Sequence, residues 1–168
     1  MPKEKGLQEL FHDTLRDVYY AERKIVTALQ KMKRAALAEE LETAFERHRE
    51  QTQGQIERLQ RVFEIIGKPA RGKTCEAIEG LIGETEEVID EYNGSAALDA
   101  GLIGCAQAVE HYEISRYGTL RRWAEELGLA EAAGLLNETL KEEAETDAAL
   151  TKLAERVAND RAKAGKVA

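Results

Sequence analysis

The sequence lacks most of the features that would place it outside the class of helical bundles. It has two prolines and two cysteines in 168 residues, and its aromatic content is only 5%. No stretch approaches the roughly 20 consecutive apolar residues of a membrane-spanning helix. Met1 is followed by Pro2, Lys3, Glu4 and Lys5, without the apolar core of a signal peptide. We therefore expect a cytoplasmic protein with no membrane partner.

A surplus of positive charge is also missing. The formal net charge is −8, whereas phosphate binding needs a basic face, so we expect no nucleic-acid partner. The two cysteines, Cys75 and Cys105, are predicted to be free thiols in a reducing compartment. With 43% hydrophobic and 33% charged residues, the chain fits one domain whose core needs no disulfide.

Helical periodicity dominates the rest of the chain. Apolar residues recur every three or four positions, and no alternating β-branched run is bounded by turns. Breaks occur at Gly67–Gly72, at Asn93–Ser95 and at Gly128, where glycine, asparagine and proline favour turns or helix caps. The pattern predicts an all-α protein with helices at about 5–34, 38–66, 74–92, 95–127 and 130–160, followed by a basic flexible tail at about 161–168.

The lengths of these segments predict their topology. Tight turns join the first two helices and the last two, so that each pair forms an antiparallel hairpin. The middle helix would be ~27 Å long at 1.5 Å per residue, enough to carry the chain back along the bundle. This predicts a ferritin-like four-helix bundle with an extra crossover helix. The apolar stripe of that helix needs a partner, either the bundle or a second subunit, and Gly80 and Gly83 would allow close approach.

Acidic residues interrupt the core-facing stripes of three helices. The predicted stripe of helix 5–34 is apolar except for one glutamate, and the helices at 95–127 and 130–160 repeat the pattern. These acids are Glu22, Glu110, Glu113, Glu143 and Asp147. Helix 38–66 has no acid on its stripe, but it is polar at the same level, where His48 lies with Gln51 beside it. Hairpin geometry predicts that all of these residues meet in one polar layer.

Five buried carboxylates must be neutralised, because burying one anion costs several kcal/mol. Protonation with raised pKa values is one way, and bound cations are the other. Two divalent ions would offset four charges, and an oxygen-rich site with an imidazole suits iron or manganese. Such a pair can be bridged by carboxylates and can react with peroxide or oxygen.

Several segments together resemble a known family. They are LFHDTLRDVYYAERKI, HREQTQGQIERL, CEAIEGLI, VEHYEISRYGTL and LNETLKEEAETD. In order and spacing they resemble the YciF-like branch of the ferritin-like superfamily, bacterial proteins associated with stress responses. The resemblance implies a homodimer with a dinuclear iron or manganese centre. Carried over by position, the implied metal ligands are Glu22, Glu110, Glu113, Glu143 and Asp147.

Helix 38–66 departs from the family pattern. Relatives commonly read H-x-E-E-T, whereas this chain offers His48, Glu50 and Gln51, so that an acid is replaced by an amide. Ferritin-like enzymes also use Glu-x-x-His on two helices. Here Glu50 and Glu143 are followed three residues later by glutamine and threonine. Asp147, one residue beyond the second missing histidine, offers an oxygen ligand instead.

Three functions are compatible with these residues. The first is a dinuclear metal protein that acts on a small oxidant, peroxide or oxygen, in stress defence. The second is a metal-free structural or interaction protein that kept the fold after losing ligands. Iron storage is the third, and it requires a large shell, so a dimer would exclude it.

Overall fold

The computed structural model describes residues 4–165. The helical elements are α1 (Leu7–Ala35), α2 (Glu39–Ile65), α3 (Glu76–Glu91), α4 (Leu98–Glu126), α5 (Ala130–Leu153), a π-helical turn (Ala154–Ala158) and α6 (Asn159–Ala164). Within residues 4–165 no strand forms, which confirms the predicted all-α class. None of the helices in this range is long and apolar enough to cross a membrane.

The predicted breaks coincide with helix ends. Gly67 and Gly128 have φ values of 66° and 72°, a left-handed conformation that glycine adopts without a steric penalty. Each closes the helix before it, because Lys68 N donates to Phe63 O at 3.0 Å and Leu129 N donates to Ala124 O at 2.8 Å. The crossover and the turn of the second hairpin therefore begin where the sequence places them.

The last helical segment extends past its predicted end at about residue 160. The chain passes from α5 through the π-helical turn into α6, and it remains helical through Ala164. The π-helical turn keeps Ala158 buried, and residues 161–164 (RAKA) are all good helix formers. Gly165, with φ at 66°, ends the helix. Residues 166–168 of the predicted tail lie outside the described residues.

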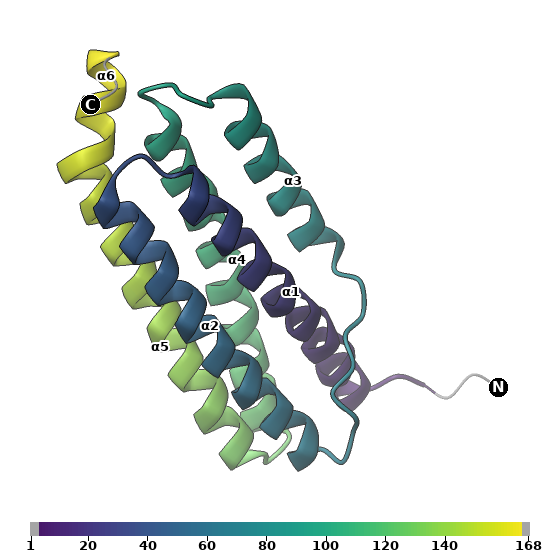
Figure 1. Ribbon diagram of the computed structural model, residues 1–168. Helices are drawn as coiled ribbons and strands as arrows, with labels where there is room; N and C mark the ends of the chain where they lie inside the picture. The colour runs from purple at the N-terminus through teal and green to yellow at the C-terminus, as the bar shows by residue number, and fades with distance from the viewer. Residues whose placement is uncertain (1–3, 166–168) are drawn as a thin grey trace.

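The connection between the hairpins follows the ferritin-like path (Figure 1). Helices α1 and α2 are antiparallel, as are α4 and α5, and α3 carries the chain back so that α4 starts at the end where α2 began. The segment 66–75 runs along α1, where Lys73 N donates to Arg16 O at 3.2 Å. Helices α2 and α4 consequently run parallel, which a simple up-down-up-down bundle would not allow.

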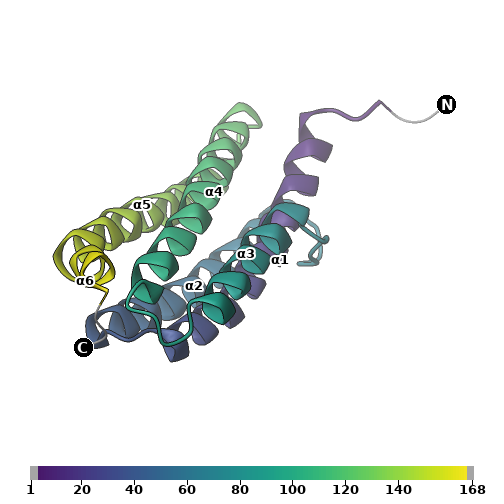
Figure 2. The same cartoon turned by 90° about the horizontal axis from the view of Figure 1, so that it is seen from above.

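Helix α3 packs outside the four-helix bundle, against α1 and α4 (Figure 2). Ile78 is fully buried there, so α3 finds its partner within the chain. No part of the described chain approaches Gly80 or Gly83 closely, because nothing lies within 4 Å of a Cβ atom added at either. Instead, Gly101 of α4 admits the neighbouring helix: a Cβ atom at Gly101 would lie 2.7 Å from Val88 Cγ1.

The core consists of two apolar clusters separated by a polar layer. One cluster includes Ile25, Leu29, Phe45 and Leu102, and the other includes Leu15, Leu59, Leu120 and Leu136. Between them, all four bundle helices bury polar side chains. These are Glu22, His48, Thr52, Gln55, Glu110, Glu113, Thr139 and Glu143.

Candidate metal centre

Four of the five predicted acids are buried in the polar layer. Glu22 projects from α1, Glu110 and Glu113 from α4, and Glu143 from α5, and none is more than 1% exposed. Each is carried inward by the apolar stripe around it, since residues three and four positions apart share a helix face. The 3.6-residue repeat thus places these acids where the sequence predicts them.

His48 of α2 joins this group. One ligand atom from each of His48, Glu110, Glu113 and Glu143 can be chosen so that all lie within 4.8 Å of one another. His48 Nε2 is 2.8 Å from Glu110 Oε1 and 3.9 Å from Glu143 Oε2. The shorter contact lacks hydrogen-bond geometry, so both ring nitrogens remain without a hydrogen-bond partner. Converging donor atoms of this kind suit a cation.

Two neutral side chains hold two of the carboxylates in place. The Tyr117 hydroxyl donates to Glu22 Oε1, and Gln55 Nε2 donates to Glu143 Oε1. Tyr117 and Gln55 are fully buried, and the spacing of residues along one helix does not indicate these partners. They orient Glu22 and Glu143 and leave the second oxygen of each free.

Many polar atoms in the layer have no hydrogen-bond partner. Buried polar groups are nearly always paired in folded proteins, so a concentration of unpaired ones needs a cause. The unpaired atoms of the layer are Glu22 Oε2, His48 Nδ1 and Nε2, Gln55 Oε1, Glu110 Oε2, Glu113 Oε1 and Oε2, and Glu143 Oε2. Almost all are acceptors, and either protons or metal ions can satisfy them.

Arginine does not neutralise the layer. Arg58 forms a two-pronged ion pair with Glu142, with contacts of 2.6 and 2.8 Å, at the edge of the α2–α5 seam. Arg116 packs its guanidinium 5.3 Å from the centroid of the Tyr112 ring, and Glu113 has no ion pair among the described residues. Among the described residues, the buried carboxylates therefore have no arginine or lysine partner.

Burial raises the pKa of every carboxyl in the group. It raises the pKa of Glu22 to about 8, and the negative charge of Glu143 adds to the effect. The pKa of Glu110 is raised to about 7, again chiefly by burial. For Glu113 and Glu143, burial is also the main cause, and the pKa of each lies well above its ordinary value. Without metal, the layer is neutral only when protons occupy it.

The remaining predicted ligands lie elsewhere. Asp147 is half-buried at the edge of the layer, where it accepts a hydrogen bond of 3.2 Å from Gln107 and lies 3.2 Å from His111 Nε2. Glu50 is exposed, and Gln51 is half-buried in the wall of a pocket. None of these three belongs to the converging group, although Asp147 is close enough to raise the pKa of Glu110.

The donor set fits iron or manganese. Four carboxylates with one imidazole make an oxygen-rich group of hard and borderline ligands. A softer metal would be favoured by thiolates, but Cys75 and Cys105 lie outside this group. The unpaired oxygens of Glu22 and Glu143 also leave each of these acids free to bind an ion while its other oxygen stays hydrogen-bonded.

Comparison with known proteins places the chain in a known family. Residues 6–163 match the family described as Domain of unknown function (DUF892), and the chain belongs to this family. It is 47% identical to Protein YciF of Escherichia coli (strain K12) over 151 residues, which are 89% of this chain and 91% of that protein. The predicted membership among YciF-like proteins is thereby confirmed.

Solved structures show the same architecture. The crystal structure of the E. coli stress protein YciF matches with a TM-score of 0.86 at 47% identity, covering 90% of this chain and 96% of that one. YcfI of Rhodopseudomonas palustris, for which a structural role has been suggested, matches with a TM-score of 0.85 at 43% identity, covering 89% and 96%. The ferritin-like arrangement is therefore shared with close relatives.

Proposed function

We propose that the protein holds a dinuclear iron or manganese centre in its polar layer and acts on peroxide or oxygen in stress defence. The observation that carries the proposal is the convergence of buried, unpaired ligand atoms. His48, Glu110, Glu113 and Glu143 present such atoms within 4.8 Å of one another. The match to a relative that is a stress protein supports the physiological setting.

The converging group would hold one ion. Glu22 would help to hold the second ion, because it is buried beside Glu113. The two carboxyls are close enough that Glu22 raises the pKa of Glu113 and Glu113 lowers the pKa of Glu22. Four carboxylates would balance the charge of two divalent ions, with His48 bound as neutral imidazole. Once loaded, iron or manganese would supply electron exchange with a small oxidant.

The chain's own residues prepare the site. Tyr117 and Gln55 hold one oxygen of Glu22 and of Glu143, and this fixes the direction of the free oxygen of each. The apolar clusters on both sides exclude water along the bundle axis. A dry, preformed ligand set lowers the reorganisation needed when the oxidant reacts.

A metal-free structural role is the second candidate, and one observation favours it. Helix α2 supplies the amide Gln55 at the layer and no acid, and Thr52 turns its hydroxyl to His48 O at 2.8 Å. With the pKa of the buried acids raised, a protonated layer is chemically reasonable near neutral pH. YcfI, the R. palustris relative for which a structural role has been suggested, gives this alternative its precedent.

Elemental analysis tests the choice between these functions. Protein produced with iron and manganese supplied should contain about two metal ions per chain, and Glu143→Gln should lose most of them. Glu57→Gln removes an exposed acid from α2 and should keep the metal content of the wild type. The loaded protein should consume peroxide faster than either the metal-free protein or Glu143→Gln.

The opposite results would support the structural role. If the metal content stays at background and unfolding is insensitive to added iron and manganese, the metal proposal fails. Size-exclusion chromatography tests the predicted homodimer in the same preparation. A dimer also excludes iron storage in a shell, whereas a large assembly would make iron storage a candidate function again.

A further inference from the structure

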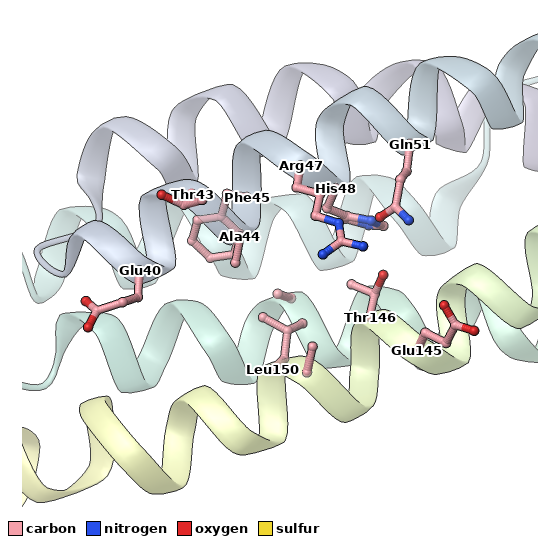
Figure 3. A pocket seen from close by; sticks show the side chains of 12 residues that line it. Glu40, Thr43, Ala44, Phe45, Arg47, His48, Gln51, Glu145, Thr146 and Leu150 are labelled. Atoms are coloured by element: carbon pink, nitrogen blue, oxygen red, sulfur yellow. The ribbon is translucent and has the colours of Figure 1, made fainter.

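A pocket of about 320 Å³ opens between α2 and α5 (Figure 3). In the close-up, Arg47, His48 and Gln51 from α2 face Thr146 and Leu150 from α5 across the hollow. None of these α5 residues belongs to the converging ligand group. The pocket is therefore a separate feature that meets the candidate metal centre at one residue.

Small side chains create the hollow. Ala44, Ala106 and Ala149 line it from α2, α4 and α5, so the three helices leave space that larger residues would fill. Phe45 and Leu150 add buried apolar surface to the same wall. An apolar lining of this kind contributes binding energy for an organic group.

His48 forms the inner end of the pocket. Its side chain lines the cavity, is only 4% exposed, and has two ring nitrogens without hydrogen-bond partners. Its Nε2 is 2.8 Å from Glu110 on the opposite side. A molecule in the pocket would reach an unsatisfied imidazole at the edge of the polar layer.

The size of the pocket argues for an occupant larger than hydrogen peroxide. A water molecule takes about 30 Å³ in the liquid, so the pocket holds several times the volume that a small inorganic oxidant needs. It falls at the lower end of the roughly 300–1,000 Å³ range of small-molecule sites. The occupant that fits is an organic molecule of modest size.

The charges at the mouth disfavour an anionic occupant. Glu40, Arg47 and Glu145 are exposed and line the rim, giving one positive and two negative side chains. An anion would approach a rim with net negative charge on a chain of net charge −8. Charged side chains are also depleted from the centres of protein interfaces. The charged rim therefore favours a mouth that is open to solvent over one that is covered by another protein.

We propose that the pocket binds an uncharged organic molecule that has an apolar body and one hydroxyl-like end. The body lies against Phe45 and Leu150, and the polar end points to His48. Organic hydroperoxides belong to this class. Their assignment as the substrate rests on the proposed function, whereas the binding site itself does not depend on any metal.

The test uses metal-free protein, so that binding is measured apart from reaction. The probe is 2-phenylpropan-2-ol, an unreactive alcohol analogue of an organic hydroperoxide, titrated while amide and imidazole NMR signals are recorded. Saturable shifts should cluster at Ala44, Ala106, His48 and Leu150. Benzoate, an anion of similar size, should bind at least about tenfold more weakly.

A matched pair of variants locates the site. Ala149→Phe places a ring in the mouth, at an exposed position where folding is not strained, and should weaken probe binding at least about tenfold. Ala148→Phe adds the same ring one residue earlier on α5, at an exposed position that does not line the pocket. This control should bind the probe as the wild type does.

Three results would overturn the proposal. They are the absence of saturable shifts at the pocket, equal weakening by both variants, and dissociation of a dimer by Ala149→Phe alone, which would make the pocket an interface between copies. Probe binding with no metal found by elemental analysis would refute the proposed function and leave the binding site standing. Metal loading without probe binding would refute the binding site alone.

Discussion

Tyr117 of α4 donates its hydroxyl hydrogen to Oε1 of Glu22 on α1. Both side chains are fully buried, and their residues are 95 positions apart in the sequence. This contact fixes the one acid that α1 contributes to the polar layer. It also joins the first hairpin to the second at the polar layer, which separates the two apolar clusters.

Removing the Tyr117 hydroxyl should therefore destabilise the metal-free bundle. Tyr117→Phe keeps the ring but leaves Glu22 Oε1 without its donor, so we expect a loss of about 1–3 kcal/mol in the free energy of unfolding. Urea denaturation followed by circular dichroism measures it. Tyr19→Phe is the matched control, since its hydroxyl accepts only a 3.3 Å contact from Gln60, and it should cost about 0.5 kcal/mol or less. Equal losses would show that the Glu22 contact has no special weight.

The buried carboxyls make a second prediction, for the effect of pH. Folding raises the pKa of Glu22 from 4.5 to about 8 and that of Glu110 to about 7. A carboxyl with a raised pKa stabilises the folded state below its unfolded value and loses that contribution as the pH rises through the folded value. The melting temperature of metal-free protein should thus fall between about pH 4.5 and 8, as read by calorimetry.

Two comparisons make this prediction specific. Glu22→Gln removes one titrating group and should flatten the pH dependence, whereas Glu57→Gln, on the exposed face of α2, should not. If the proposed metal centre forms, manganese should raise the melting temperature more at pH 8 than at pH 5.5, because the ions replace protons that are already lost. A melting temperature that rises from pH 5.5 to 8 without metal would contradict the protonated layer.

A third prediction concerns Asp99 of α4, which holds the turn between α1 and α2. Its two carboxylate oxygens accept hydrogen bonds from Leu37 N at 2.8 Å and Ala38 N at 2.9 Å. Asp99→Ala would leave these two backbone donors unpaired, and we expect it to cost about 3 kcal/mol in urea denaturation. Asp90→Ala, at an exposed position of α3, should change stability by about 0.5 kcal/mol or less. If Asp99→Ala also costs only about 0.5 kcal/mol or less, the turn between α1 and α2 is stable without the two hydrogen bonds to Asp99.

Sequence periodicity predicted the fold because helix packing depends mainly on which face is apolar. The predicted core-facing stripe of the first helix is buried from Leu15 to Met32, and Glu22 is buried with it. The glycine breaks located the start of the crossover at Gly67 and the turn of the second hairpin at Gly128, since both positions adopt positive φ. The crossover followed from the length of the middle segment, which is a property of the chain and not of its contacts.

The periodicity was less informative about individual side chains at the polar layer. Asp147 has the spacing of a seam residue, but its side chain turns outward to Gln107 and His111. The acceptors of the buried Gln55 and Tyr117 lie on other helices, and a stripe on one helix carries no information about them. Side-chain direction across helices depends on tertiary packing, which the spacing of residues does not specify.

A fourth prediction concerns the close contact of α3 with α4. A Cβ atom at Gly101 would lie 2.7 Å from Val88 Cγ1, so Gly101→Ala should push α3 away and lower the melting temperature. Gly104→Ala is matched to it, because Gly104 lies on the same helix with nothing within 4 Å of an added Cβ. That variant should instead stabilise the protein by about 0.5–1 kcal/mol through helix propensity.

Shortening the partner side chain should rescue the first variant. Val88→Ala in the Gly101→Ala background removes the methyl group that meets the added Cβ, so the double variant should unfold at a higher temperature than Gly101→Ala alone. Calorimetry of the two single variants and the double variant gives the interaction between the sites. Additive losses would mean that the two positions do not meet, and that α3 is held by Ile78 and its neighbours without a close approach at Gly101.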